Sequence, residues 1–319
     1  MKNIAFIALS ALLLICLTTT AQEPETQQIV VPLSKPGERG ILQVNLMNGG
    51  IEVSGYNGKE VIINARELTK DELKKISGSW TTGEAALDRY YDLRTDNQDA
   101  ASSNNPFFYD LSGTASGNDK KDNINRNTEG MKKISGTTFH FSAEEKNNVV
   151  EIQSDSWMQR LMLTIKVPKN FNLHITTTNS GNIKIDNIDG YLEIENMTGS
   201  IEAKEISGSA VLNTFNGSIK IDFDKIDPDK TMSFSTMMGD IELKLPATSK
   251  TTLKMKTDGG EIYTDFDMKV LQNNPKIDKE SRGGTYKVSL TKWIFGEING
   301  GGQEYTLQSM NGNFFIRKK

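Results

Sequence analysis

The chain has 319 residues, with 37 Lys and Arg against 41 Asp and Glu, one cysteine and two histidines. This mildly acidic, mixed-sign composition argues against a nucleic-acid binder or a clamp for anionic membranes. Cys16 lies in the segment Met1–Ala21, so the rest of the chain has no thiol for a disulfide, a metal site or a nucleophile. His140 and His174 lie in alternating runs that predict solvent-facing strand positions. We therefore expect no metal and no cofactor.

The segment Met1–Ala21 is typical of a removable signal peptide. Lys2 gives a basic start, an apolar run covers Ile4 to Leu17, and the small residues Thr19 and Ala21 precede Gln22. The apolar run is shorter than a typical spanning helix, and no later stretch is long enough to be one. We expect an exported protein of the periplasm, the outer cell surface or the medium, and not an integral membrane protein.

Residues from Gln28 to Ala65 alternate between apolar and polar, which predicts short strands separated by Asn-Gly turns at Asn48-Gly49 and Asn57-Gly58. The sequence Thr69-Lys70-Asp71-Glu72 fits a capping box that opens one or two helical turns.

The segment from Thr95 to Ser135 is rich in Asn, Ser, Gly, Asp and Lys and poor in apolar residues. Such a segment cannot bury enough surface to offset its ordering entropy, so it is predicted to be a flexible insertion. Its aromatic cluster Phe107, Phe108 and Tyr109 has two interpretations: a docking segment for a partner, or a local hydrophobic contact with the body.

A nine-residue repeat follows. Its glycines are Gly181, Gly190, Gly199, Gly208 and Gly217, and apolar residues stand two and four positions after each. That alternation predicts a short strand with one buried face, and the glycine supplies a turn. A further apolar series is predicted to fill the corner, and consists of Ile188, Met197, Ile206 and Phe215. Because repeats this short cannot fold alone, they must stack as a β-solenoid.

Charge decides the length of one coil. With a nine-residue coil Glu193 would stack on Glu202, whereas with an 18-residue coil Lys184 stacks on Glu202 and Glu202 on Lys220. Opposite charges on adjacent strands stabilise and like charges destabilise, so the 18-residue coil is predicted.

The pattern continues beyond the strict repeat with longer corners. Gly239 follows Gly217 at a 22-residue step, with a loop around Asp227-Pro228-Asp229, and places Glu242 on Lys220 and Lys244 on Asp222. Gly260 follows at a 21-residue step and places Asp265 on Lys244. The segment from Asn311 to Arg317 has the form of a last rung.

These observations predict an all-β fold, a single-stranded β-solenoid with coils of roughly 18–22 residues. We assign residues 1–21 to a signal peptide, 22–94 to an N-terminal β-strand cap and the start of the solenoid, 95–135 to the insertion, and 136–319 to the repeat domain. Solenoid ends expose unpaired strand edges. We expect Gln28–Ala65 to cover one end and the segment after Trp293 to contribute to the other, and end-to-end self-association is a further option.

Three stretches resemble a known family: Ser233 to Ile241, Gly259-Gly260-Glu261-Ile262-Tyr263, and Asn299-Gly300-Gly301-Gly302 with Met310 to Asn313. The family consists of exported bacterial proteins described as a proposed adhesin domain of unknown function with a β-solenoid fold. The resemblance covers Gln28 to the C-terminus apart from the insertion. It implies export and a repetitive β fold, and it carries over no catalytic or binding residues.

Three acid pairs have two interpretations: Asp222 with Asp224, Glu193 with Glu195, and Asp265 with Asp267. Stacked β-helices can host glycan-cleaving carboxylate pairs. Here lysines alternate with the acids and no Arg occurs between Leu161 and Ser281, which favours mutual neutralisation. Inside the repeat block only Tyr191 and Tyr263 are expected to be outward aromatics for stacking on a sugar, since the three tryptophans fall outside it. This argues against a glycan-binding ladder on the repeats and leaves a glycan site at the loops open.

The sequence thus favours a non-enzymatic exported β-solenoid that acts as an adhesin-like or cell-envelope scaffold protein. Its expected partner is an envelope protein or a surface glycan, and not nucleic acid. Two alternatives stay open: a carbohydrate-active β-helix enzyme (a glycan lyase or hydrolase), and a periplasmic sensor or signalling partner.

Overall fold

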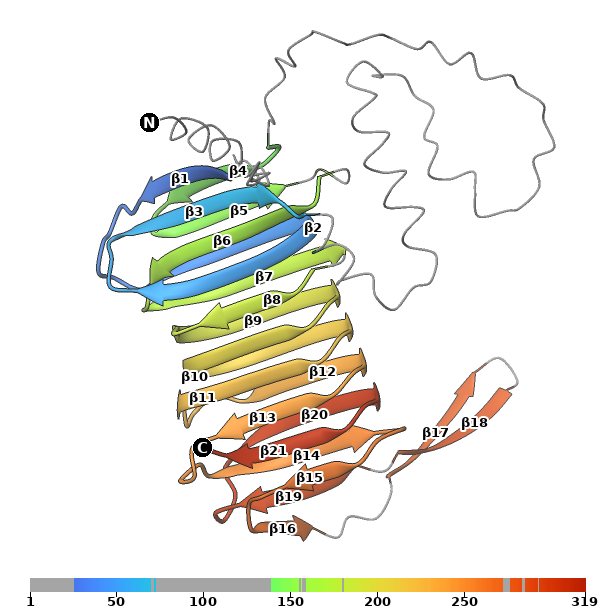
Figure 1. Cartoon of the computed structure of the whole chain (residues 1–319). Helices are drawn as coiled ribbons and strands as arrows, with labels where there is room; N and C mark the ends of the chain where they lie inside the picture. The colour runs from blue at the N-terminus through green and yellow to red at the C-terminus, as the bar shows by residue number, and fades with distance from the viewer. Residues whose placement is uncertain are drawn as a thin grey trace, which may run out of the picture.

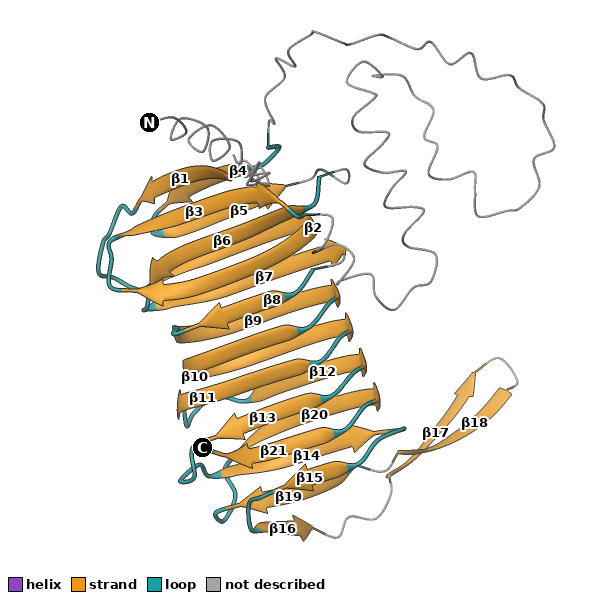
Figure 2. Ribbon diagram, viewed as in Figure 1, coloured by secondary structure: helices purple, strands orange, loops and turns teal. Residues whose placement is uncertain are grey.

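The computed structural model describes residues 26–69, 72, 139–154, 156, 159–179, 181–271, 276–282, 285–291 and 293–319. The predicted signal peptide and the insertion with Phe107, Phe108 and Tyr109 lie outside these residues. All of the chain's described elements are strands (Figure 2), and the expectation of an all-β fold is confirmed.

The strands stack as rungs in two ladders, and β2 and β10 each pass through both (Figure 1). In spatial order, ladder A consists of β4 (Ser142–Lys146), β5 (Val149–Ser154), the first half of β2 (Gly40–Tyr56), β7 (Phe171–Asn179), β9 (Asp189–Thr198), the second half of β10 (Ile201–Asn216), β12 (Met232–Met238), β20 (Gln303–Asn311), β14 (Thr251–Thr257), β19 (Ile294–Ile298) and β16 (Met268–Leu271).

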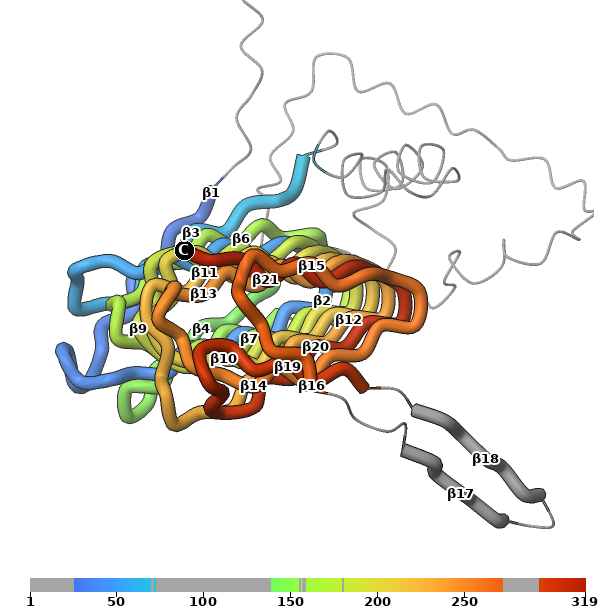
Figure 3. Tube along the Cα trace, turned by 90° about the horizontal axis from the view of Figure 1, so that it is seen from below, coloured from blue at the N-terminus to red at the C-terminus, as the bar shows by residue number. Residues whose placement is uncertain are grey.

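Ladder B consists of β1 (Thr26–Pro32), β3 (Glu60–Glu67), β6 (Leu161–Pro168), the second half of β2, β8 (Ile183–Asp186), the first half of β10, β11 (Ile219–Ile226), β13 (Ile241–Leu245), β21 (Phe314–Lys318) and β15 (Ile262–Thr264). Strands β17 (Lys276–Arg282) and β18 (Thr285–Thr291) form a separate hairpin. Seen along the stack (Figure 3), successive rungs superimpose in outline.

The core lies between the two ladders. Strands such as β13 alternate buried and half-buried positions, as the period-two pattern predicts, and the buried isoleucines, leucines and valines of both ladders form one continuous cluster. In the middle of the stack the strands are parallel and in register: Glu202 lies between Lys184 and Lys220, one 18-residue coil away on either side. The predicted 18-residue spacing is therefore confirmed.

Glycines occupy one corner of every central rung for a steric reason. A Cβ on Gly199 would lie 2.1 Å from the carbonyl oxygen of Gly181, and one on Gly217 would lie 2.1 Å from that of Gly199. The same contact recurs from Gly239 to Gly217 at 2.3 Å. Real Cβ atoms do not approach oxygen this closely, so only glycine lets the chain turn here while the rungs stay at β-sheet spacing. We call this edge of the stack the glycine corner.

Polar side chains line the inside of the glycine corner. Thr214 donates its hydroxyl to the carbonyl of Gly199 at 2.9 Å, and Thr236 donates to that of Gly217 at 2.8 Å. These belong to a polar ladder, one residue per rung, made of Thr177, Asn196, Thr214, Thr236, Ser309 and Thr257. The turn carbonyls, which the sheet cannot pair, thereby receive hydrogen bonds.

The polar ladder corrects the predicted corner series. Ile188 and Ile206 are buried as expected, at the opposite corner. Met197 and Phe215 are instead 53% and 55% exposed. The reason is that Asn196 and Thr214 already fill the inside of the glycine corner, so strand alternation turns the next residue outward.

The order of the rungs also differs from the order along the chain. Strands β20 and β21 lie between β12–β13 and β14–β15, so the C-terminal rung is not the last one. Lys244 consequently lies beside Arg317, and the expected stacking of Asp265 on Lys244 is wrong. Glu242 on Lys220 and Lys244 on Asp222 are confirmed, and Arg317 reaches diagonally to Glu242 at 2.8 Å.

Antiparallel strands close the two ends. At the N-terminal end β1 and β3 lie outside β6 in ladder B, and β4 lies outside β5 in ladder A. At the other end β19 and β16 follow β14. The predicted caps are thus correct for β1, β3 and β19. They are wrong for β2, β20 and β21, which are interior rungs because they pair on both sides.

The predicted capping box is present. The Thr69 backbone N–H donates to the Glu72 carboxylate at 2.9 Å, and the Glu72 N–H donates to the Thr69 hydroxyl at 3.3 Å. Arg66 donates to both Glu72 oxygens, and its hydrogen bond lowers the pKa of Glu72 to about 2.

Candidate functional site

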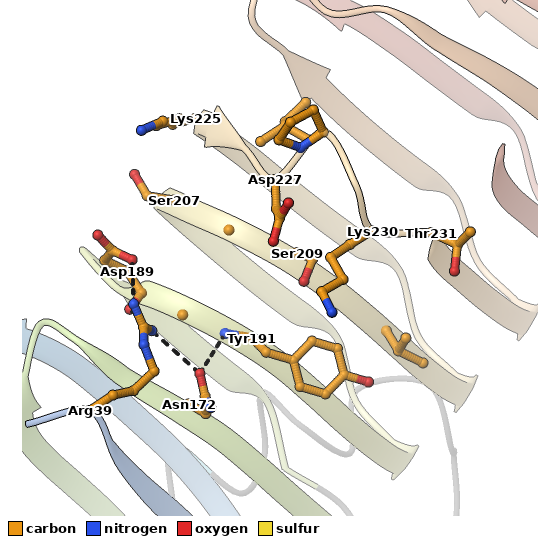
Figure 4. Close-up of a pocket in the computed structure, with 15 residues that line it drawn as sticks. Arg39, Asn172, Asp189, Tyr191, Ser207, Ser209, Lys225, Asp227, Lys230 and Thr231 are labelled. Carbon is orange, nitrogen blue, oxygen red and sulfur yellow. Dashed lines mark hydrogen bonds and ion pairs between the residues drawn. The ribbon is translucent and has the colours of Figure 1, made fainter. Parts of the chain in front are cut away.

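A groove of about 850 Å³ lies at the corner opposite the glycine corner, where the ladder A strands begin (Figure 4). Its floor is formed by the starts of β7, of β9 and of the second half of β10, through Asn172, Tyr191 and Ser209. A loop after β11 overhangs it. This loop, residues 227–231, contains the extra residues that the 22-residue step from Gly217 to Gly239 predicted.

One end of the groove is held by an arginine clamp. The Arg39 guanidinium donates to the Asp189 backbone carbonyl at 2.6 Å and to its carboxylate at 3.1 Å. It also lies 3.4 Å from the Asn172 side-chain oxygen, which accepts the Tyr191 backbone N–H at 2.9 Å. These bonds fix three neighbouring rungs at the rim, and they leave the charge of Arg39 largely neutralised.

The other end carries groups that are free to bind. Lys225 and Lys230 are exposed and have no ion pair within the described residues. The side chain of Asp227 hangs over Ser209 (Figure 4), and one of its oxygens accepts the Asp229 backbone N–H at 3.1 Å. Hydroxyls, a carboxylate and two cations around an open groove suit a polar, hydroxylated or acidic ligand.

Tyr191 supplies the aromatic surface of the groove. Its ring is half-buried and meets His174 edge-on, with centroids 6.1 Å apart. Burial raises the pKa of Tyr191, and the nearby Glu193 carboxylate raises it further. The phenol therefore stays protonated at neutral pH and can donate a hydrogen bond.

The acid pairs considered from the sequence do not line this groove. Asp222 accepts Lys244 at 3.1 Å and Lys319 at 2.7 Å, and Lys319 also contacts Asp224. Burial alone would raise the pKa of Asp222, but the hydrogen bonds from Lys319 and Lys244 bring it below its ordinary value. The pair is therefore neutralised.

In each of the other two pairs, one acid has a contact within the described residues. Glu193 lies 3.9 Å from His174, and Asp265 accepts the Lys318 backbone N–H at 2.7 Å.

The histidines and aromatics divide between surface and groove. His140 is exposed and His174 half-exposed, as the alternation predicted. Tyr263 is also on the surface, where it stacks on Phe315 with a centroid separation of 5.3 Å at the far end of the molecule. Sequence reasoning placed Tyr191 outward but missed Arg39, Lys225 and Lys230. The signal that could have found the lysines is the four-residue excess in the coil after Gly217.

Two kinds of feature are absent from the described residues. No helix among them is long and apolar enough to cross a membrane. Nor do they contain a group of three or more His, Cys, Asp or Glu that could hold a metal ion.

Comparison with known proteins gives one family. The model of the Toastrack DUF4097 family matches residues 22–293. No curated protein matches the sequence. Among solved structures, a proposed cell adhesion protein from Clostridium sporogenes is similar with a TM-score of 0.40 and 11% identity, over 93% of this chain and 100% of that one. A proposed adhesin from Bacteroides fragilis gives 0.32 and 10%, over 92% and 97%.

Proposed function

The chain belongs to the Toastrack DUF4097 family, and we propose that it is an exported, non-enzymatic β-solenoid that acts as an adhesin-like interaction protein of the cell envelope. The solenoid assignment is supported by the parallel, in-register pairing of strands at the 18-residue spacing. Export is supported by the signal-like segment Met1–Ala21 of the sequence.

The observation that carries the binding function is the groove of Figure 4. It combines the Tyr191 ring with the free cations Lys225 and Lys230 and with the side chains of Asp227 and Ser209. A flat ring beside several hydrogen-bonding groups is the arrangement that recognises a sugar: the ring packs on apolar C–H faces, and the polar groups bind hydroxyls or a carboxylate. The proposed ligand is a surface glycan.

The non-enzymatic part rests on the state of the acids. A glycosidase needs one protonated and one ionised carboxyl facing a common substrate site. In the described residues, Asp222 and Asp224 share the Lys319 ammonium, which favours the ionised form of Asp222. A lysine inserted between the carboxylates occupies the place that a scissile bond would need.

Calorimetric titration with a panel of neutral and acidic oligosaccharides tests both parts. We expect binding that Tyr191→Ala and Lys230→Glu each weaken at least about tenfold, since each removes an interaction of about 1.4 kcal/mol or more. Tyr263→Ala, an exposed tyrosine outside the groove, is the matched control. The absence of binding to every sugar would overturn the ligand class. Release of new reducing ends that Asp222→Asn abolishes would overturn the non-enzymatic assignment.

A further inference from the structure

The glycine corner carries an exposed apolar stripe on its outer side. Met197, Phe215, Met237 and Met310 stand on four successive rungs, one position after the polar ladder, and are 53%, 55%, 37% and 55% exposed. Met238, the residue after Met237, adds a further exposed side chain at 48%. A shallow groove of about 610 Å³ runs beside this apolar stripe.

The apolar stripe is not a consequence of how the corner folds. The fold requires glycine at the turn and a polar residue inside it, but it makes no demand on the outward residue between them. On the rungs at either end of the stripe that outward position is Thr178 and Asp258. Contiguous exposed apolar side chains bordered by polar ones are typical of an interaction surface.

The column of outward residues next to the apolar stripe contains an acid on its second rung and a cation on its last. In rung order it reads Thr176, Glu195, Asn213, Ser235, Gln308 and Lys256. Glu195 has no ion pair among the residues that the structure describes, whereas Lys256 lies 3.7 Å from Asp258. An acid near one end and a cation at the other make this column complementary to itself when it is reversed.

We propose that a second copy of this chain packs on the apolar stripe, antiparallel and related by a two-fold axis. The axis passes between Phe215 and Met237, so that Phe215 of each copy meets Met237 of the other and Met197 meets Met310. The same operation brings Glu195 within one rung of Lys256 of the second copy, at both ends of the contact. Because the rung spacing is identical in the two copies, the side chains of the two stripes stay aligned from one rung to the next.

The strength of this dimer follows from its size. Six rungs span about 24 Å, which with a width of a few residues is smaller than the roughly 800 Å² per partner of a standard interface. We therefore expect a weak dimer with a dissociation constant on the order of 10–100 µM. Methionine suits such a contact because its side chain adapts to an identical neighbour.

Sedimentation equilibrium between about 5 and 500 µM tests the proposal, since this range brackets the expected constant. We expect the average mass to rise from monomer to dimer. Phe215→Lys and Met237→Lys should each raise the dissociation constant at least tenfold. Both residues are exposed, so circular dichroism should show an unchanged fold. Val30→Lys changes a similarly exposed apolar residue far from the apolar stripe and should have no effect.

The charged ends provide a rescue experiment. Glu195→Lys and Lys256→Glu should each weaken the dimer, because each places like charges one rung apart, and the double variant should restore it. A monomer at every concentration would overturn the proposal. Dimerisation that Phe215→Lys and Met237→Lys leave intact would also overturn it. A protein that stays monomeric and whose Met197, Met237 and Met310 resist peroxide oxidation would overturn the proposal as well. In that case residues 73–138 of the same chain, or a bound partner, would cover the apolar stripe.

Discussion

The polar ladder inside the glycine corner makes a quantitative prediction about Thr236. Its side chain is buried, at 4% exposure, and donates to the carbonyl of Gly217 at 2.8 Å. Valine has the same shape and the same preference for strands, so Thr236→Val removes the hydrogen bond without opening a cavity. The half-buried Gly217 carbonyl then loses the donor that Thr236 supplies, which costs about 1–3 kcal/mol.

Urea unfolding at neutral pH measures this cost. With a slope of a few kcal/mol per molar, as is usual for urea, a loss of about 2 kcal/mol lowers the midpoint by several tenths of a molar or more without changing the slope. The matched control is Thr164→Val on the outward side of β6, where no hydrogen bond of the threonine side chain is found in the described part of the chain. Equal midpoints for the two variants would refute the role of the polar ladder.

Three further perturbations follow from the same geometry. Gly217→Ala places a Cβ 2.1 Å from the Gly199 carbonyl oxygen and should lower the free energy of unfolding by about 1–3 kcal/mol or more through overpacking. Gly37 has open space around it but a φ of +95°, so Gly37→Ala should cost only about 1 kcal/mol. Thermal unfolding of both variants distinguishes them. Removing residues 300–319 deletes β20 and β21 from the interior, so hydrogen exchange should show loss of protection in β12, β13 and β14 together, and unchanged protection there would contradict the inserted rung. Arg66 lowers the pKa of Glu72 in the folded protein to about 2, so the stabilisation by this ion pair is present above about pH 4.5 and is lost as the pH falls toward 2. The difference in unfolding midpoint between wild type and Glu72→Gln should therefore vanish over that range. A difference independent of pH would refute the pairing.

The sequence predicted the repeating part of the fold because each rung there repeats the same local rule. Alternation set the buried face, glycine set the turn, and Lys184, Glu202 and Lys220 distinguished an 18-residue coil from a nine-residue one. The order of the rungs was not predictable by this reasoning. No local feature of Phe314–Lys318 indicates that this strand inserts between β13 and β15. A strand with this alternation pairs equally well with either neighbour, so long-range contacts decide its position.

The candidate site was harder to predict for a related reason. Period-two alternation showed that Tyr191 faces outward, but it is silent on which outward residues share a groove. Arg39 comes to Asp189 from a distant part of the chain, and Lys230 comes from a loop outside the period. The exposed positions of Met197 and Phe215 were missed because apolar character was taken as burial, whereas the inside of their corner is occupied by Asn196 and Thr214.

An adhesin-like protein that binds its partner at the outer surface of the cell must have its groove within reach from outside. A specific protease site inserted in the exposed loop at Pro228–Lys230, beside the groove, can be probed on intact cells and on cells whose outer envelope has been opened. We expect cleavage on intact cells while an interior marker protein stays whole. Protection of the site until the envelope is opened would contradict an adhesin-like role.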